Sequence, residues 1–521
     1  MPTVLFRTYA PDQAEHIPDI LRQALNVFPT GVDFRVMNSF EGVTDPLPGT
    51  PLGISSVRDV NDASLVFAGD ESELYSLSGI NWSAIGRALG YSVASDGRWE
   101  FAPYEQLVAA TNGNDLMQIS NAAGSQFEDL VDQTDPDNYT DEIVPNGGLG
   151  DPDSPTFIAP VGKTMATIGS FLVIGNFFDN QNGELINAVR WSRSGDPRKW
   201  KIDPTFQTNI VNIQAGGPVQ RVVASGEYGV VFQENQIGRL DLSEGIGFAY
   251  TATDQRRGAL MAGGVIPHGR RIFFSSNDGF FIFNGVDSEP IGDGRIDRRF
   301  RDFYDNANRR RVSGAIDEEN KLAIWSVPFN TGGDTPNRLF MYHWPSGEWS
   351  ESDEAVSILV SLETTGISSD DPVFGQEFTD TGAFAETLSD SPLFRGGELR
   401  FAAFDTNRRL AFNNGAKKPS LIQTSDIQLN PRQRSLLTKV RPIFDTEQGL
   451  NTPTVRAGGR DTHRALTSFN DERPVLDDGE CPVRRENRYH QFIVQTPNDS
   501  DIDHITGVAI EAEDFVPVGE R

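Results

Sequence analysis

The side chains that most often perform catalysis or hold metals are sparse in this chain. It contains six His, and no two of them stand four residues apart, the spacing that places two imidazoles on one helical face. Cys481 is the single cysteine, which excludes a Cys-x-x-Cys pair and an intrachain disulfide and fits folding in a reducing compartment. Spacings typical of a serine nucleophile elbow or a phosphate-binding loop do not occur. The sequence therefore predicts no catalytic residue, no metal site and no cofactor.

An acidic segment at residues 128–153 is the first unusual stretch. It holds nine carboxylates and no Lys or Arg, together with several Pro and Gly. Clustered oxygens suit Ca²⁺, but residues 135–142 lack the glycine and the spacing of an EF-hand. We therefore favour a long solvated loop over a calcium site.

A second unusual stretch, residues 294–311, is rich in arginine. Four apolar side chains fall at the spacing of one helical face: Ile296, Phe300, Phe303 and Tyr304. Four arginines lie mainly off that face: Arg295, Arg298, Arg299 and Arg301. Two interpretations stay open, a surface helix whose arginines pair with nearby Asp residues and a helix that docks a subunit or partner. A nucleic-acid contact is disfavoured, because carboxylates interleave with the arginines.

Composition restricts the class of protein. Acidic residues number 74 and basic residues 45, a net charge of −29 that argues against a whole-surface nucleic-acid binder. Of the basic residues 38 are Arg, the cation of fixed, bidentate contacts. The first residues lack the pattern of a secretory signal, and the longest apolar run, residues 166–178, is too short to span a bilayer. We expect a soluble protein without a membrane span, made in the cytosol.

The 521 residues contain 50 Gly and 31 Pro, which favours many short strands joined by tight turns. Pairs of short apolar runs separated by turn residues, each typical of a hairpin, recur at intervals of 42 to 65 residues. Their centres are Val66, Val108, Val173, Val231, Phe273 and Ala323. Propeller repeats run to about 40–50 residues per four-stranded blade. The sequence predicts an all-β chain with an irregular, roughly six-bladed β-propeller; an irregular multi-sheet protein without a closed ring is the alternative.

These patterns predict four parts. Residues 1–55 form an extended segment with one short helix at 17–27. Residues 56–360 form the propeller, with loop insertions near 128–155 and 176–186. A polar stretch at 361–397 is a loop or linker, and residues 398–521 form a C-terminal β-domain resembling a sandwich.

Parts of the sequence resemble the tail hub or nozzle proteins of short-tailed bacteriophages (podoviruses), a family also described as packaged-DNA stabilisation proteins. The first matching stretch is Val-Phe-Ala-Gly-Asp-Glu-Ser-Glu-Leu-Tyr at residues 66–75. Further matching stretches lie at residues 26–31, 98–101, 108–115, 189–192, 226–234, 271–280, 290–297, 312–317, 342–344, 347–350, 441–442, 481–484 and 488–490. The similarity covers most of the chain and departs from the family at 128–155 and 364–395, where the family's partner contacts would differ.

The resemblance implies a non-enzymatic virion protein, assembled in the bacterial host cytoplasm as a homohexameric ring below the portal and its head-to-tail adaptor proteins. Such a ring would form the distal tail channel that retains packaged double-stranded DNA and conducts it during ejection. Tail fibres, spikes or a needle are possible further partners. A lumen that lets DNA move freely should be acidic, because Lys and Arg bind phosphates strongly. Four residues of the acidic segment are candidates for such a lining: Asp132, Asp135, Asp137 and Asp141.

A tail protein that binds or degrades glycans is the alternative function. A propeller glycosidase needs paired carboxylates in a cleft, and the chain has carboxylates in excess but no diagnostic spacing. A glycan-binding tip would use exposed aromatic side chains near Trp82, Trp99 or Trp200.

Overall fold

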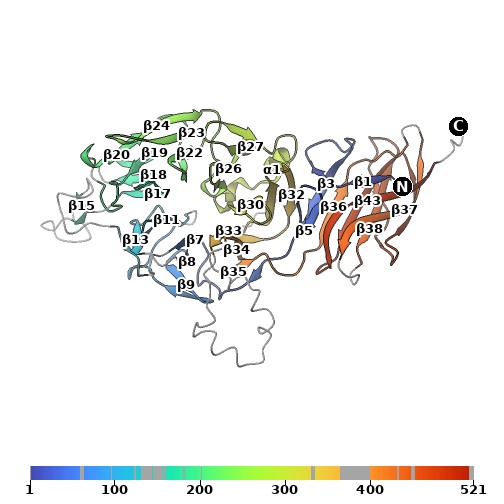
Figure 1. Cartoon of the computed structure of the whole chain (residues 1–521), viewed down its shortest axis with the longest axis horizontal. Coiled ribbons are helices and arrows are strands. Elements are labelled where there is room, and N and C mark those ends of the chain that lie inside the picture. The colour runs from blue at the N-terminus through green and yellow to red at the C-terminus, as the bar shows by residue number, and fades with distance from the viewer. Residues whose placement is uncertain are drawn as a thin grey trace, which may run out of the picture.

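The fold is all-β, as predicted. The computed structural model describes residues 2–58, 64–94, 97–121, 125–130, 143–144, 156–157, 160–179, 182–200, 202, 204–329, 335–363, 399–430, 433–446 and 452–514. Figure 1 shows a propeller joined side by side to a second β-domain, which carries the strands nearest the two chain ends.

Seven four-stranded antiparallel meanders form the blades of the propeller within the described residues. Blade 1 consists of β7 (Gly53–Arg58), β8 (Ser64–Gly69), β9 (Leu74–Ser78) and β10 (Asn81–Ala84), and blade 2 of β11 (Glu100–Tyr104), β12 (Leu107–Thr111), β13 (Gln118–Asn121) and β14 (Glu128–Asp129). Blade 3 consists of β17 (Val161–Ile168), β18 (Phe171–Asp179), β19 (Gly183–Trp191) and β20 (Asn209–Asn212), and blade 4 of β21 (Val219–Ser225), β22 (Tyr228–Gln233), β23 (Ile237–Ser243) and β24 (Gly247–Asp254). Blade 5 consists of β25 (Val265–His268), β26 (Arg271–Ser276), β27 (Gly279–Phe283) and β28 (Ser288–Pro290). Blade 6 consists of β29 (Ser313–Asp317), β30 (Leu322–Val327), β31 (Arg338–His343) and β32 (Glu348–Ser352). Blade 7 consists of β33 (Val356–Glu363), β34 (Leu399–Asp405), β35 (Leu410–Phe412) and β6 (Glu41–Gly42).

The first strand of each blade faces the centre, and these strands form a closed ring. Each of β7, β11, β17, β21, β25, β29 and β33 contacts the next, and β33 contacts β7 again. Side-chain hydroxyls bind neighbouring backbones across the ring: Ser56 Oγ accepts from the Glu363 N–H at 3.0 Å, and Thr164 Oγ1 from the Val222 N–H at 3.1 Å. The propeller is therefore closed, and the number of blades is seven rather than six.

Blade 7 escaped prediction because its strands are not contiguous in the sequence. Three of them lie on either side of residues 364–398, and the fourth, β6, comes from the N-terminal region and pairs with β35. The predicted boundary at residue 398 is therefore wrong, since β34 and β35 belong to the propeller. Pairing of a strand from near the N-terminus with the last blade ties the ring together.

The hydrophobic core of the propeller consists of clusters between neighbouring blades. Between blades 7 and 1, for example, Phe404 and Phe412 pack with Val66 and Ala68. Aromatic and β-branched strand residues suit these positions, because each blade buries both faces against its neighbours. The Phe-rich composition is thus used at the seams between blades.

The second domain is a sandwich of two sheets contributed by both ends of the chain. One sheet contains β1 (Thr3–Leu5), β4 (Val27–Pro29), β5 (Phe34–Val36), β37 (Ser435–Thr446), β41 (Cys481–Asn487) and β43 (Ile502–Asp514). The other contains β2 (Thr8–Tyr9), β3 (Ile20–Leu25), β36 (Ser420–Thr424), β38 (Thr454–Arg460), β39 (Ser468–Phe469), β40 (Arg473–Pro474) and β42 (Tyr489–Thr496). Residues 1–55 are therefore not a separate extended segment: they complete both domains.

The helix predicted at residues 17–27 is a strand. Ile20, Leu21 and Ala24 are buried in β3, which pairs with β36 on one side and β32 on the other. Their spacing fits either a helix or a strand whose inward–outward alternation is interrupted once. The register shift in β3 is that interruption. Pairing on both sides decides for the strand.

One predicted loop insertion differs from the structure, and most of the other, near 128–155, lies outside the described residues. Residues 176–179 and 183–186 continue β18 and β19, so this segment is mainly an extended hairpin. Within 128–155, residues 128–129 form β14, and residues 143–144 form β15 (Ile143–Val144), which pairs with β16 (Thr156–Phe157). The remaining elements of the described chain are α1 (Asp297–Phe303), η1 (Pro204–Phe206), η2 (Ala262–Gly264) and η3 (Asn306–Arg311).

Propeller and sandwich share both a sheet and a core. Strand β3 of the sandwich runs parallel to β32 of blade 6, with Leu25 opposite Glu351, so the two sheets are continuous. One hydrophobic cluster extends from Phe280 and Trp325 in the propeller to Phe492 in the sandwich. A hinge between the domains would have to break this sheet and this core together.

Candidate functional site at the mouth of the propeller channel

The central channel of the propeller is a cavity of about 510 Å³ enclosed by the inner strands. A second cavity of about 220 Å³ lies at the end of the channel where these strands begin. Arg98 and Ile358 line both cavities, so the two adjoin. We call this end the arginine mouth. The volume of the channel falls in the range of small-ligand sites, and the mouth is smaller still, so neither is a passage for a double helix.

Arg98 lies two residues before β11, against the residues that lead into two other inner strands. Its Nη1 donates a hydrogen bond to the Val312 carbonyl at 2.6 Å. A Cβ on Gly263 would stand only 2.0 Å from Arg98 Nη1 and from the Val312 oxygen, so this position requires glycine. Burial, and then the nearby cation Arg221, lower the pKa of Arg98 to about 10.

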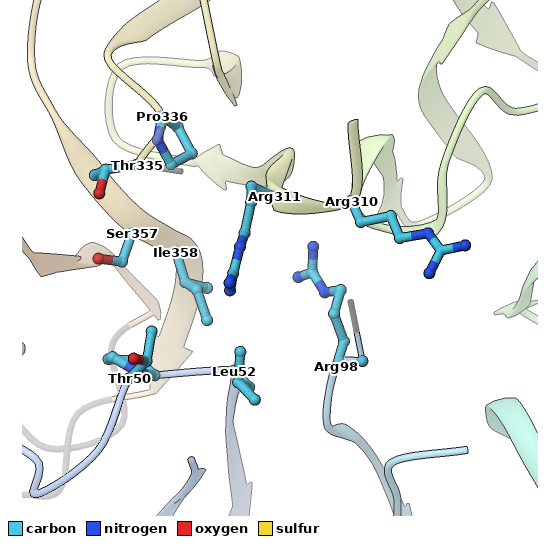
Figure 2. A pocket seen from close by; sticks show the side chains of 11 residues that line it. Thr50, Leu52, Arg98, Arg310, Arg311, Thr335, Pro336, Ser357 and Ile358 are labelled. Carbon is cyan, nitrogen blue, oxygen red and sulfur yellow. The ribbon is translucent and has the colours of Figure 1, made fainter. Parts of the chain in front are cut away.

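Other arginines surround the same space. Arg221 Nη1 donates to the carbonyls of Val265 at 2.5 Å and Ala262 at 3.2 Å. Arg98 Nη1 lies against Gly263, so both arginines adjoin the segment 262–265. Figure 2 shows Arg311 directed toward the space that Arg98 enters, whereas Arg310 is directed away. Three hydroxyl side chains also line the mouth: Thr50, Thr335 and Ser357.

Acidic groups of the channel are engaged elsewhere. Glu100 acts on Arg98 electrostatically, but its Oε2 accepts hydrogen bonds from Thr164 Oγ1 at 2.8 Å and from the Met165 N–H at 3.1 Å. Glu318 lies at the opposite end, 3.0 Å from His268 Nδ1. The arginine mouth is therefore cationic in a chain whose net charge is −29.

The predicted arginine helix exists as α1, which contains Arg298, Arg299 and Arg301, whereas Arg295 lies just before it. Two of the four predicted arginines make intramolecular pairs. Arg299 binds Glu351 in bidentate fashion, at 2.5 Å and 3.0 Å, and Glu351 is only 2% exposed. Tyr9 of the sandwich donates to the same carboxylate at 2.6 Å, and Arg338 lies 3.8 Å from it. We call Tyr9, Arg299, Arg338 and Glu351 the interdomain cluster. Arg295 pairs with Glu348 at 2.9 Å.

Arg298 and Arg301 are exposed on the same helix. The Asp12 carboxylate accepts from the backbone N–H groups of Arg298 and Arg299, so the N-terminal region caps α1. The sequence predicted that these arginines pair with neighbouring Asp side chains. Arg295 and Arg299 instead pair with Glu residues of β32. Only Arg298 and Arg301 stay candidates for contacts with another subunit.

The other predicted site residues are placed as follows. Asp132, Asp135, Asp137 and Asp141 lie outside the described residues. Trp99 and Trp200 are buried, Trp99 with its indole N–H bound to the Asp70 carbonyl, so neither is an exposed glycan platform. Trp82 is half-buried and donates to the Asp45 carbonyl.

Two further kinds of site are absent from the described residues. Among the described residues, no group of three or more His, Cys, Asp or Glu side chains could hold a metal ion. None of the helices in that part of the chain has the length and apolar character needed to cross a lipid bilayer.

Asp297 at the start of α1 makes stability depend on pH. Burial, with help from the carboxylates of Asp12 and Asp293, raises its pKa to about 7. Its ordinary pKa is lower, so the folded state loses stability as pH rises from about 4 to 7 and the carboxyl ionises. We expect Asp297→Asn, which can still accept from the Phe280 N–H, to raise the free energy of unfolding by about 2 kcal/mol above pH 7.

Urea unfolding at several pH values measures this effect. The gain from Asp297→Asn should shrink by about 1 kcal/mol or more between pH 8.5 and pH 5.5. Asp302→Asn changes the same charge at an exposed position of the same helix and should show no such trend. A pH-independent gain at Asp297 would show that its carboxyl is not held neutral.

Sequence reasoning missed the arginine mouth and the acidic half of the interdomain cluster. Arg98 and Arg221 stand singly in strand-like segments, and only ring closure brings them together. Tyr9 and Glu351 likewise meet Arg299 only through the pairing of β3 with β32. The unusual arginine content was the one available signal for either site.

No protein-family model and no curated protein matches this chain. Among solved structures, the Pan2 WD40 domain of Neurospora crassa aligns with a TM-score of 0.38 and 8% identity, over 73% of this chain and 97% of that one. PorZ of Porphyromonas gingivalis aligns with a TM-score of 0.34 and 12% identity, over 83% of this chain and 46% of that one. YCF48 bound to the D1 peptide aligns with a TM-score of 0.34 and 13% identity, over 60% of this chain and 84% of that one. Similarities this weak carry no argument about activity, so the propeller assignment rests on the strand pairing and ring closure seen in this chain.

Proposed function

We propose that this chain is a structural, non-enzymatic component of the tail of a short-tailed bacteriophage, the nozzle or hub ring that forms the distal DNA channel. In this proposal a homohexamer docks below the head-to-tail adaptor proteins, retains the packaged genome and conducts it during ejection. The sequence resemblance at the stretches cited above supports this assignment.

The observation that carries the proposal is the rigid connection between propeller and sandwich. A shared sheet, a shared hydrophobic cluster and the interdomain cluster all cross the boundary. A wall that holds pressurised DNA needs subunits that do not hinge, whereas many enzymes close one domain over another. The rigid body suits a load-bearing wall.

The size of the propeller channel also bears on the proposal. At about 510 Å³ it has the volume of a small-ligand site, so a DNA passage would have to lie between protomers rather than through one. Each protomer would then contribute one face of its two-domain body to the lumen. Heterologous contacts that close on themselves generate such a ring.

The exposed arginines of α1 provide a direct test of ring contacts. We expect native mass spectrometry of the full-length chain, assembled with its adaptor, to show a closed hexamer. The double variant Arg298→Glu, Arg301→Glu should reduce ring formation at least tenfold if α1 docks a neighbour, because like charges across an interface repel. Its unfolding midpoint should stay near that of the wild type, since both side chains are exposed.

A matched control is Arg256→Glu with Arg270→Glu, because both side chains are exposed and lie away from α1. Unchanged assembly in the α1 variant would remove this helix from the interface. A wild-type chain that stays monomeric with its adaptor and releases sugars from host glycans would instead overturn the conduit and favour the glycan-degrading alternative.

A further inference from the structure

Arg98, which lines both cavities, and Arg221, which lines the channel, are two cations without a carboxylate partner. Each uses Nη1 for backbone carbonyls, and among the described residues neither forms an ion pair. Other half-buried arginines of this protein do have carboxylate partners: Arg299 pairs with Glu351, and Arg87 pairs with Asp115 and Asp129.

Two such guanidinium groups held close together are unfavourable without a counter-charge. Burial removes hydration from each, and their mutual repulsion is weakly screened in a narrow cavity. Glu100, the carboxylate that acts electrostatically on Arg98, is held by Thr164 and by the backbone of Met165. Backbone anchoring through Val312, Ala262 and Val265 fixes both arginines in place, so they cannot turn out to solvent without losing these bonds.

We infer that the junction of the arginine mouth with the channel is a binding site for an oxyanion, a phosphate or carboxylate group, held between Arg98 and Arg221. Each guanidinium has N–H groups beyond those bonded to the backbone, and planar N–H pairs match the oxygen spacing of these anions. Arg311 faces the same space, and Thr50 also lines the mouth. The inference is independent of a role in a phage tail.

The cavity defines the size of the ligand. A volume of about 220 Å³ exceeds that of a single water several-fold, and the adjoining channel adds about 510 Å³. An inorganic phosphate fits at the mouth, and a larger molecule could place its anionic group there and its remainder in the channel. Ile54 and Ile266 among the channel residues would contact the apolar part of such a molecule.

Thermal unfolding and isothermal titration of the full-length chain test the site. The probes are inorganic phosphate and acetate, each compared with chloride at the same ionic strength. We expect at least one probe to bind and to raise the unfolding midpoint, because a ligand that binds only the folded state stabilises it. Arg98→Gln and Arg221→Gln should each weaken that binding about tenfold or more, since each removes a charged hydrogen-bond donor.

Arg270→Gln is the matched control: it removes the same charge from an exposed position next to Gly269, at the opposite end of the channel. Binding of phosphate alone would identify a phosphate site, and binding of acetate alone a carboxylate site. If Arg98→Gln fails to fold, Arg221→Gln and titration of the wild type still show whether the site binds an anion. Binding of neither probe, or binding equally strong in all three variants, would overturn the inference.

Discussion

Replacing Glu351 with Gln should lower the free energy of unfolding by about 3–5 kcal/mol, the cost of breaking a buried ion pair. The substitution keeps the side-chain volume but leaves Arg299 and Arg338 without their shared counter-charge. It also weakens the acceptor of the Tyr9 hydroxyl, whose pKa is raised, first by burial and then by the charge of Glu351. Urea unfolding at neutral pH measures the loss.

Glu184→Gln is the control for this prediction. Glu184 pairs with Lys163 at 3.4 Å, but both side chains are at least half exposed, so we expect a change of only about 0–1 kcal/mol. A double-mutant cycle with Arg299→Gln then isolates the coupling between Arg299 and Glu351. A loss at Glu351 no larger than that at Glu184 would show that the interdomain cluster does not hold the domains together.

Trp349→Ala should be comparably damaging, at about 3–5 kcal/mol. Trp349 is fully buried in β32, its indole N–H donates to the Ile291 carbonyl at 2.8 Å, and its ring packs against Phe280 and Tyr342. These contacts lie at the seam between blades 5 and 6, in the cluster that continues into the sandwich. The truncation would therefore leave a cavity in the core shared by both domains.

Trp344→Ala provides the comparison within the same hairpin. Trp344 is half-buried and contacts His268 and Phe273 at the edge of the cluster, so we expect less than half of the loss seen at Trp349. Equal losses at the two positions would contradict the assignment of Trp349 to a continuous core. Calorimetry also reports whether propeller and sandwich unfold in a single transition, as the shared sheet predicts.

The local parts of the fold were accessible from the sequence. The hairpin of β26 and β27 illustrates why: two runs rich in Phe and Ile flank Asn277 and Asp278, and Gly279 adopts a φ of +137°. A Cβ at Gly279 would also collide with the Asp297 carboxylate, so glycine is required there twice over. Neighbouring residues determine such a turn, and periodicity reveals it.

Blade 7 and the sandwich were not accessible in the same way, because they depend on pairing between distant segments. Strand β6 is two residues long and has no pattern of its own, yet it completes the last blade. Residues 20–25 form a strand only because β36 and β32 flank them. Local periodicity contains no information about such partners.

The candidate site shows the same division. The arginine-rich helix stood out by composition, whereas Glu351, the residue that fixes Arg299, looked like any acidic residue of a strand. Arg98 and Arg221 belong to different blades and meet only where the inner strands converge. Ring closure, not sequence spacing, creates the arginine mouth.

Electron cryo-microscopy of the phage particle that carries this chain tests the proposed function most directly. Our account predicts a closed ring of six copies at the distal end of the tail, each a rigid propeller–sandwich body, surrounding a lumen that lies between protomers. Copies arranged as separate spikes at the periphery of the tail, or absent from the particle, would contradict it.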